Sequence, residues 1–368
     1  MHALLTALVV AAAPPDAGAP LKPSMQSALA AVITLQPLVA SPVGFRDPAN
    51  AAKIRQSLEV LAPLEHFFTK RSPSAGIATL FARELRAAND EYQRRGYEAA
   101  RIRLRSLTSL CFGCHLREPT DADLATSSAA LDALDLTHLE RASFFASTRQ
   151  FERAFTEWNQ AFTVKPKNDV EAFEQTEALR QALSVTVQGL DDPKRTVALL
   201  AQNKDRPELP GFVTRQMVRW LVEAKAWQAE KFDARKKTPP QLVARAKALI
   251  DVAGTAKSVA PDDMRLVSHL RAASYLQEAL RREPDASTRG EALYLLGVVS
   301  AATADPHLWR LEWITLESCI RENPKTELAR RCAERLTERT WFSYTGRGGL
   351  DLPPGVGAEL GELNALAR

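Results

Sequence analysis

Glycine and cysteine are scarce in this sequence, and their scarcity already limits the fold. The 368 residues include 16 glycines and 4 cysteines, whereas the 22 prolines gather between segments of helical periodicity. An apolar share of 45% is enough to build a substantial core. The chain is longer than one ordinary domain, so we expect two or three domains. Together these features predict an all-α protein.

An excess of charge of one sign is also missing. The 48 lysines and arginines are nearly balanced by 44 aspartates and glutamates, which leaves a formal net charge of +4. Nucleic-acid-binding proteins concentrate basic residues on one face and often interleave them with aromatic residues. The sequence contains no such ladder. We therefore expect no nucleic-acid partner.

Common catalytic signatures are absent as well. The sequence has no Ser-His-Asp order, no glycine-rich phosphate loop and no HExxH motif. These patterns mark nucleophilic hydrolases, nucleotide-binding enzymes and metalloproteases. An enzyme is therefore the least supported class of function.

The strongest chemical signal that is present is Cys111-Phe112-Gly113-Cys114-His115. Two cysteines two residues apart, followed at once by histidine, form the attachment signature of a c-type haem. On a helix these three side chains share one face, because residues three and four apart lie on the same side. The motif therefore predicts one covalently bound haem c, with Cys111 and Cys114 as thioethers and His115 as the proximal iron ligand.

Other sites built on paired cysteines fit this motif less well. A zinc site would need two more ligands at similar spacing, and no second CxxC or HxxxH follows. A thioredoxin-like CxxC would need a βαβ setting, and no strand pattern surrounds this one. The alternative that remains is a disulfide or a pair of thiols beside an unrelated histidine.

The N-terminal residues 1–20 resemble a secretory signal peptide. An apolar run from Ala3 to Ala13 is too short to cross a bilayer, and small residues suitable for cleavage follow it. The run departs from the usual pattern because no Lys or Arg precedes it. Export to the periplasm agrees with the haem motif, since c-type haem is attached outside the cytoplasm. Apart from this signal peptide, we expect no segment that enters or crosses a membrane.

Four helical patterns precede and include the haem motif. The first covers about residues 24–39, the second begins at Asp47-Pro48, the third begins at Ser72-Pro73, and the fourth follows a turn at Gly96. The positions expected to face inward are Met25, Leu29, Val32 and Ile33, then Ile54, Leu58 and Leu61, then Leu80, Phe81, Leu85, Ala88 and Tyr92, and finally Ala100, Leu104 and Leu107.

Four antiparallel helices with CxxCH near the end of the fourth resemble the cytochrome c′ group, including its low-spin, methionine-ligated members. The resemblance covers residues 21–119 and depends on helix order and on the place of the motif. It implies a four-helix bundle that encloses the haem, with His115 as the proximal ligand.

Bundle topology restricts the sixth iron ligand. The start of the first helix and the end of the second lie level with the end of the fourth, and the ligand-type side chains there are Met25 and His66. The resemblance favours Met25, because methionine-ligated relatives carry their ligand near the start of the first helix. Met25, His66 and an open position remain as alternatives. A thioether raises the reduction potential relative to a second imidazole, whereas an open position lets small gases bind.

A linker at 120–136 and a helical repeat domain at 137–340 are expected to follow the bundle. Tetratricopeptide spacing appears in Ala142, Phe145, Phe151, Ala154, Trp158, Ala161 and Pro166, and less clearly in Ala292, Leu296, Gly297, Trp313, Leu316 and Pro324. Helical periodicity between these units predicts a solenoid of α-α hairpins, because single repeats cannot bury their own faces. Residues 341–368 are expected to form a tail with a short helix.

The other two cysteines, Cys319 and Cys332, fall on consecutive helices of the last hairpin. In an oxidising compartment a disulfide would join them, provided that the helix register brings the sulfurs together. The sequence does not decide that register.

Three functions remain open at this point. The leading one is a periplasmic monohaem cytochrome that transfers electrons, with the repeats docking to a redox partner protein or a membrane complex. The second is a haem-based gas or redox sensor with an open or displaceable sixth ligand. The third is a repeat-based assembly scaffold in which the haem is incidental. A dihaem peroxidase would need a second CxxCH, so we expect an electron carrier rather than a catalyst.

Overall fold

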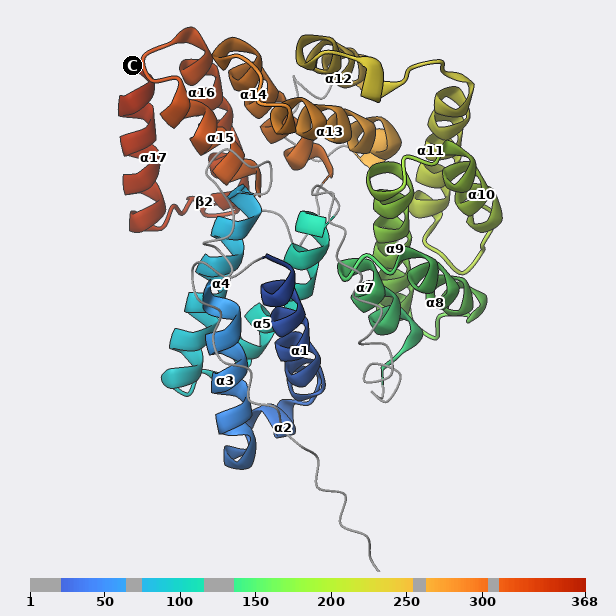
Figure 1. The fold of residues 1–368 in the computed structure, drawn as a ribbon, viewed down its shortest axis with the longest axis vertical. Helices are drawn as coiled ribbons and strands as arrows, with labels where there is room; N and C mark the ends of the chain where they lie inside the picture. Colours follow the sequence, from blue (N-terminus) through green and yellow to red (C-terminus); the bar gives the residue numbers. More distant parts are fainter. Residues whose placement is uncertain (1–20, 64–74, 116–135, 254–262, 304–310) are drawn as a thin grey trace, which may run out of the picture. The chain divides into compact units, whose positions relative to one another are not determined.

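The structure, a computed structural model, describes residues 21–63, 75–115, 136–253, 263–303 and 311–368. In this part of the chain there are sixteen α-helices and one antiparallel pair of two-residue strands (Figure 1). The predicted all-α class is therefore confirmed. None of the helices in the described ranges is both long enough and apolar enough to cross a lipid bilayer.

The chain divides into two compact units. Within the described residues, the first unit comprises 21–63 and 81–107, and the second comprises 75–80, 108–115 and everything from 136 onward. The division passes through two helices, α4 (Ala75–Gln93) and α5 (Tyr97–His115). The last turns of α5, which carry the CxxCH motif, therefore group with the second unit.

Side-chain caps and prolines set the ends of the first helices. These are α1 (Leu21–Ala40), α2 (Pro42–Arg46), a 3₁₀ turn η1 (Pro48–Asn50) and α3 (Ala51–Leu61). Asp47 accepts a hydrogen bond from the N–H of Ala49 at 2.9 Å, so the predicted start signal is used. Pro37 lies inside α1, and the helix continues past it because its carbonyl accepts the N–H of Ser41 at 3.2 Å.

The buried face of α1 agrees with the predicted one at Leu29, which is buried, and differs from it elsewhere. Val32 and Ile33 are half-buried, whereas Ala28, Ala31, Leu35 and Val39 are buried on the side that packs against α3. Apolar residues occur all around α1, so periodicity alone could not select the inner face. The predicted inner positions of α3 and α4, from Ile54 to Tyr92, are all buried and are confirmed.

The turn between α4 and α5 has the expected position and a different conformation. The N–H of Gly96 bonds to the carbonyl of Glu91 at 2.8 Å, and the N–H of Arg95 bonds to that of Tyr92 at 3.1 Å. This is a Schellman motif, and its left-handed residue is Arg95, with φ 64°, rather than Gly96. A Cβ at residue 96 would lie 2.6 Å from a Glu91 carboxylate oxygen, so the Glu91 side chain would have to shift.

The second unit is a succession of helical hairpins. Its helices pack in sequence order, α7 with α8, α10 with α11, α12 with α13, α14 with α15 and α16 with α17 (Figure 1). Their bounds are α7 (His138–Ser147), α8 (Phe151–Thr163), α9 (Asp169–Ser184) continued by a π-helical turn η4 (Val185–Gly189), α10 (Pro193–Asn203), α11 (Gly211–Ala229), η5 (Ala234–Lys236), α12 (Pro239–Ala253), η7 (Asp263–Arg265), α13 (Leu266–Arg281), α14 (Ala286–Thr303), α15 (Leu311–Glu322), α16 (Glu327–Tyr344), β1 (Thr345–Gly346), β2 (Gly349–Leu350) and α17 (Pro354–Ala367).

The repeat positions recognised in the sequence are core positions in the α7–α8 hairpin. Phe145 and Trp158 are 1% and 0% exposed, and Ala142 and Ala154 let the two helices approach closely. The side-chain hydroxyl of Thr137 caps α7 by accepting from the N–H of Glu140, and the Glu140 carboxylate in turn accepts from the N–H of Thr137 at 2.9 Å. The separate segments predicted to be helical between residues 169 and 281 correspond to helices α9 to α13 over the described ranges.

The C-terminal helix belongs to the core rather than to a tail. Leu360, Leu363 and Ala367 of α17 are buried in the same cluster as α14, α15 and α16. A short strand pair, with Gly346 opposite Gly349, turns the chain between α16 and α17. The apolar side of this last helix is therefore what completes the end of the second unit.

Gly297 allows a close helix contact in this core. A Cβ at this position of α14 would lie 2.6 Å from Cδ2 and 2.7 Å from Cγ of Leu316 on α15. Leu316 is 0% exposed, and its Cγ as well as its Cδ2 lies in the way of the added Cβ. A side chain at residue 297 would consequently push α14 and α15 apart.

We predict that Gly297→Ala lowers the stability of the folded chain by about 1–3 kcal/mol through overpacking. The matched control is Gly361→Ala on α17, where nothing lies within 4 Å of the added Cβ. That change should add about 0.5–1 kcal/mol by restricting the unfolded backbone. Thermal unfolding followed by circular dichroism checks both, and a Gly297→Ala midpoint at or above that of the wild type would show that the contact is not tight.

Candidate functional site

The CxxCH motif occupies the last two turns of α5. Ala100, Leu104 and Leu107 form the buried stripe that leads to it, as predicted. Leu110, three residues after Leu107, continues this stripe and is 1% exposed, and Phe112, on another side of the helix, is 4% exposed. A helix with apolar residues buried all round lies in a low-polarity environment. The end of α5 is therefore buried on more than one side.

The two cysteines of the motif are half-buried and are not bonded to each other. Burial, and to a lesser degree the neighbouring Cys114, raises the pKa of the Cys111 thiol to about 12. A redox-active CxxC needs the opposite shift, because its attacking thiol must ionise near neutral pH. The environment of Cys111 therefore disfavours a thioredoxin-like dithiol.

These residues fit the chemistry of a porphyrin joined by two thioethers. Both sulfurs are reduced, they lie three residues apart on one helix, and the adjacent residues Leu110 and Phe112 are buried. His115 is the last residue of α5, and its side chain lies outside the described part. Among the described residues, no group of three or more His, Cys, Asp or Glu side chains is arranged to hold a metal ion.

Of the two candidate sixth ligands, the structure describes Met25 and does not describe His66. Met25 lies in the first half of α1 and is half-buried. It belongs to the first unit, whereas Cys111 and Cys114 belong to the second, so its ligation of iron stays a prediction. His66 lies outside the described residues.

Two arginines of α5 that the sequence could not assign hold this helix in place within the first unit. Arg101 donates through Nη1 to the carbonyl of Val39 on α1 at 3.1 Å and also pairs with Glu98. Arg103 pairs with Glu84 of α4 at 2.6 Å. Because partners far along the chain decide these roles, no local sequence signal could have revealed them.

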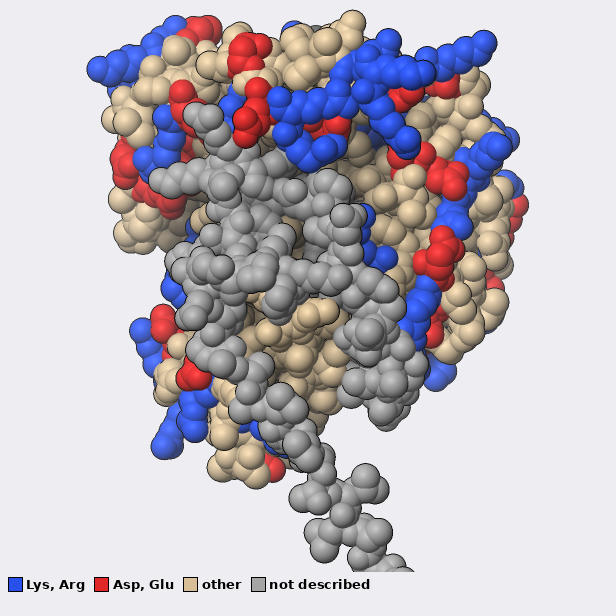
Figure 2. All heavy atoms as spheres, in the orientation of Figure 1, with Lys and Arg blue, Asp and Glu red and all other residues tan. Residues whose placement is uncertain are grey.

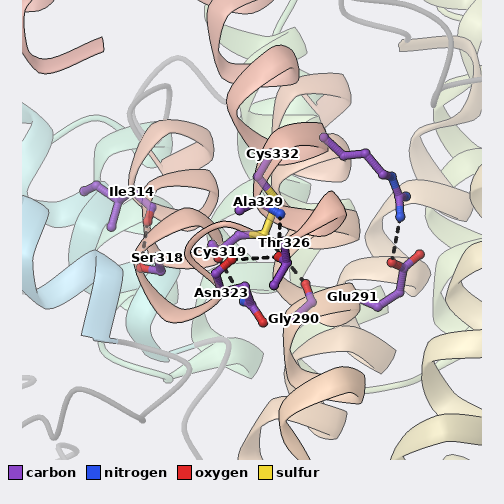
Figure 3. Close-up of a disulfide and its surroundings, with 10 residues drawn as sticks. Gly290, Glu291, Ile314, Ser318, Cys319, Asn323, Thr326, Ala329 and Cys332 are labelled. Atoms are coloured by element: carbon purple, nitrogen blue, oxygen red, sulfur yellow. Dashed lines mark hydrogen bonds and ion pairs between the residues drawn. A yellow bond between two sulfur atoms is a disulfide. The ribbon is translucent and has the colours of Figure 1, made fainter. Parts of the chain in front are cut away.

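The second pair of cysteines forms a disulfide. Cys319 on α15 and Cys332 on α16 are joined by an S–S bond of 2.03 Å, and both residues are 0% exposed (Figure 3). Between them, Asn323 donates to the carbonyl of Cys319 at 2.9 Å and Thr326 caps α16. The bond closes a loop with a sequence separation of 13, and a loop of this size contributes ~3 kcal/mol by restricting the unfolded chain.

Comparison with known proteins finds no relative of this chain. No family model, no curated protein and no solved structure matches it. The chemistry of its own residues, above all those at the end of α5, is therefore what indicates a function.

We predict that Cys111 reacts slowly with iodoacetamide in the folded, haem-free chain. A pKa of about 12 leaves about a thousandfold less thiolate at pH 8 than an ordinary thiol has, and the rate should rise about tenfold per pH unit up to that pKa. Mass spectrometry of quenched samples measures the rate, with the urea-unfolded chain as the control. Equal rates in the folded and unfolded chains would contradict the burial of this thiol.

Proposed function

We propose that this protein is an exported monohaem c-type cytochrome that transfers electrons. The observation that carries the proposal is the pair of reduced thiols on the last turns of α5, in apolar surroundings and directly before His115. Cys111 and Cys114 would hold the haem by thioether bonds, and His115 would be the proximal ligand. The bound haem would supply one-electron chemistry.

The four-helix bundle and the tetratricopeptide-like solenoid are part of the same proposal. We assign α1, α3, α4 and α5 to a four-helix bundle of the cytochrome c′ type. Support comes from the Arg101–Val39 and Arg103–Glu84 contacts, which join α5 to α1 and α4, and from the edge-to-face rings of Phe45 and Tyr92. The hairpins from α7 to α17 would form a tetratricopeptide-like solenoid, supported by their packing in sequence order.

A docking role for the second unit follows from this assignment. Stacked helical hairpins usually present an extended surface to a protein or a peptide. In an electron carrier, such a surface would bring the haem close to a redox partner protein or a membrane complex. The chain's contribution to electron transfer would then be twofold, because it sets the iron environment and selects the partner.

Export to the periplasm is supported by the second cysteine pair. Disulfides form and persist in oxidising compartments, and Cys319–Cys332 is buried where reductants have little access. The predicted signal peptide, residues 1–20, lies outside the described part of the chain. Attachment of c-type haem outside the cytoplasm would place both cysteine chemistries in one compartment.

We predict that the protein, expressed with a c-type maturation system, carries one haem that acid-acetone extraction does not remove. Cys111→Ser and Cys114→Ser should each leave one thioether, and the double variant none, because each sulfur forms one bond to the porphyrin. The reduced pyridine complex reports the number of thioethers. As a matched control, Cys319→Ala with Cys332→Ala should keep both. A colourless wild type would leave only a helical scaffold.

We predict that Met25→Ala converts a low-spin iron spectrum to a high-spin one and opens the iron to carbon monoxide, since a thioether ligand is lost. Met264→Ala, a change at a partly exposed methionine of η7, should leave the spectrum unchanged. If Met25→Ala has no effect, Met25 is not a ligand and His66→Ala is the next test. Rapid carbon monoxide binding by the wild type would favour the gas-sensor function instead.

A further inference from the structure

The outer face of α11 is apolar where a packed helix is usually polar. Its inner side packs into the second unit through residues such as Met217 and Trp220, which are both 0% exposed. On the outside, Val218 and Val222 are 51% and 64% exposed and lie one turn apart. Phe212, in the first turn, is 54% exposed. The packing of the second unit therefore does not use this apolar face.

Cations flank the exposed valines on both sides. Arg215 and Arg219 lie on one side of the valine stripe and Lys225 on the other, and all three are exposed. Among the described residues, none of the three has an acidic partner within ion-pair distance. The one acid that α11 contains, Glu223, lies one turn after Arg219 but is buried, and there it pairs with Arg265 and accepts from Ser268 at 2.8 Å. The outer face of α11 is consequently positive and apolar at once.

Elsewhere in the second unit arginines are largely neutralised. Arg245 and Arg271 share Glu230, and Arg289 pairs with Glu322. On the face shown in Figure 2, basic and acidic side chains lie next to each other in many places. The cations of α11 lack such partners, so a negative partner would meet no competing acid there.

A second copy of this chain is a poor occupant of this face. A two-fold contact would place each face against itself and bring Arg215, Arg219 and Lys225 of one copy against those of the other. Like charges in such an arrangement oppose association. The charges instead match an acidic surface with an apolar centre.

We propose that the outer face of α11, defined by Val218, Val222, Arg215, Arg219 and Lys225, binds an acidic amphipathic segment of a protein partner. The valines would pack against the apolar side of the segment, and the three cations would pair with its carboxylates. This inference depends on the docking role proposed for the second unit. It adds the chemistry of the partner and the residues that recognise it.

The test uses fluorescence anisotropy of synthetic helical peptides of about 18 residues. Each has leucines along one side, and the flanking positions are all Glu, all Gln or all Lys. The full-length protein should bind the Glu peptide most tightly, and binding should weaken as salt is added. Arg215→Ser, Arg219→Ser and Lys225→Ser together should weaken this binding by about tenfold or more.

Three other exposed cations of the second unit supply the matched control. Lys194→Ser, Lys247→Ser and Arg347→Ser together remove the same charge away from the α11 face. This variant should bind the Glu peptide as the wild type does. Equal losses in the two triple variants would overturn the proposal, because they would indicate net charge rather than a site. Val218→Ser with Val222→Ser should weaken binding without changing its dependence on salt.

Two further measurements distinguish this proposal from an effect of haem loss and from binding to a lipid surface. The Cys111→Ser, Cys114→Ser variant should bind the Glu peptide normally, so loss of the haem and loss of docking can be told apart. Binding to vesicles of phosphatidylglycerol, without binding to the Glu peptide, would assign the face to a lipid surface and overturn a protein partner. Absence of binding to every probe would overturn it as well.

Discussion

Burial at the end of α5 is the constraint on which the proposed chemistry depends. Leu110, Phe112 and Gly113 are buried next to Cys111, and burial disfavours the thiolate of Cys111 and raises its pKa. A neutral, reduced thiol in apolar surroundings is poorly suited to disulfide exchange. It is well suited to hold a large apolar cofactor once a maturation system has formed the bond.

The two cysteine pairs show how position determines chemistry. Cys111 and Cys114 lie on one helix and remain thiols, whereas Cys319 and Cys332 lie on two helices that pack together and form a disulfide. Both pairs are screened from solvent to some degree. The difference is that packing of α15 on α16 brings the second pair of sulfurs together, while the first pair stays available for thioether bonds.

Pairs of charged side chains join neighbouring helices of the second unit. Burial opposes ionisation of Glu230, yet hydrogen bonds from Arg245 and Arg271 outweigh it and lower its pKa. This carboxylate therefore holds the chain after α11 against α12 and α13 at neutral pH. Arg339 likewise joins α16 to Glu312 of α15, although burial raises the pKa of that carboxyl. With these charges paired inside, the cations on the outer face of α11 remain available to a partner.

By itself, the sequence determined the helical class, nearly all the helical segments and the CxxCH motif, because these depend on short-range spacing. The capping residues Asp47 and Thr137 and the repeat positions from Ala142 to Ala161 illustrate this local control. Only the tertiary structure decided that Ala28 and Leu35 rather than Ile33 face inward on α1. The pairing of Cys319 with Cys332 and of Arg103 with Glu84 was decided in the same way. These outcomes depend on the register between helices, which arises from packing of whole faces and leaves no mark at any one residue.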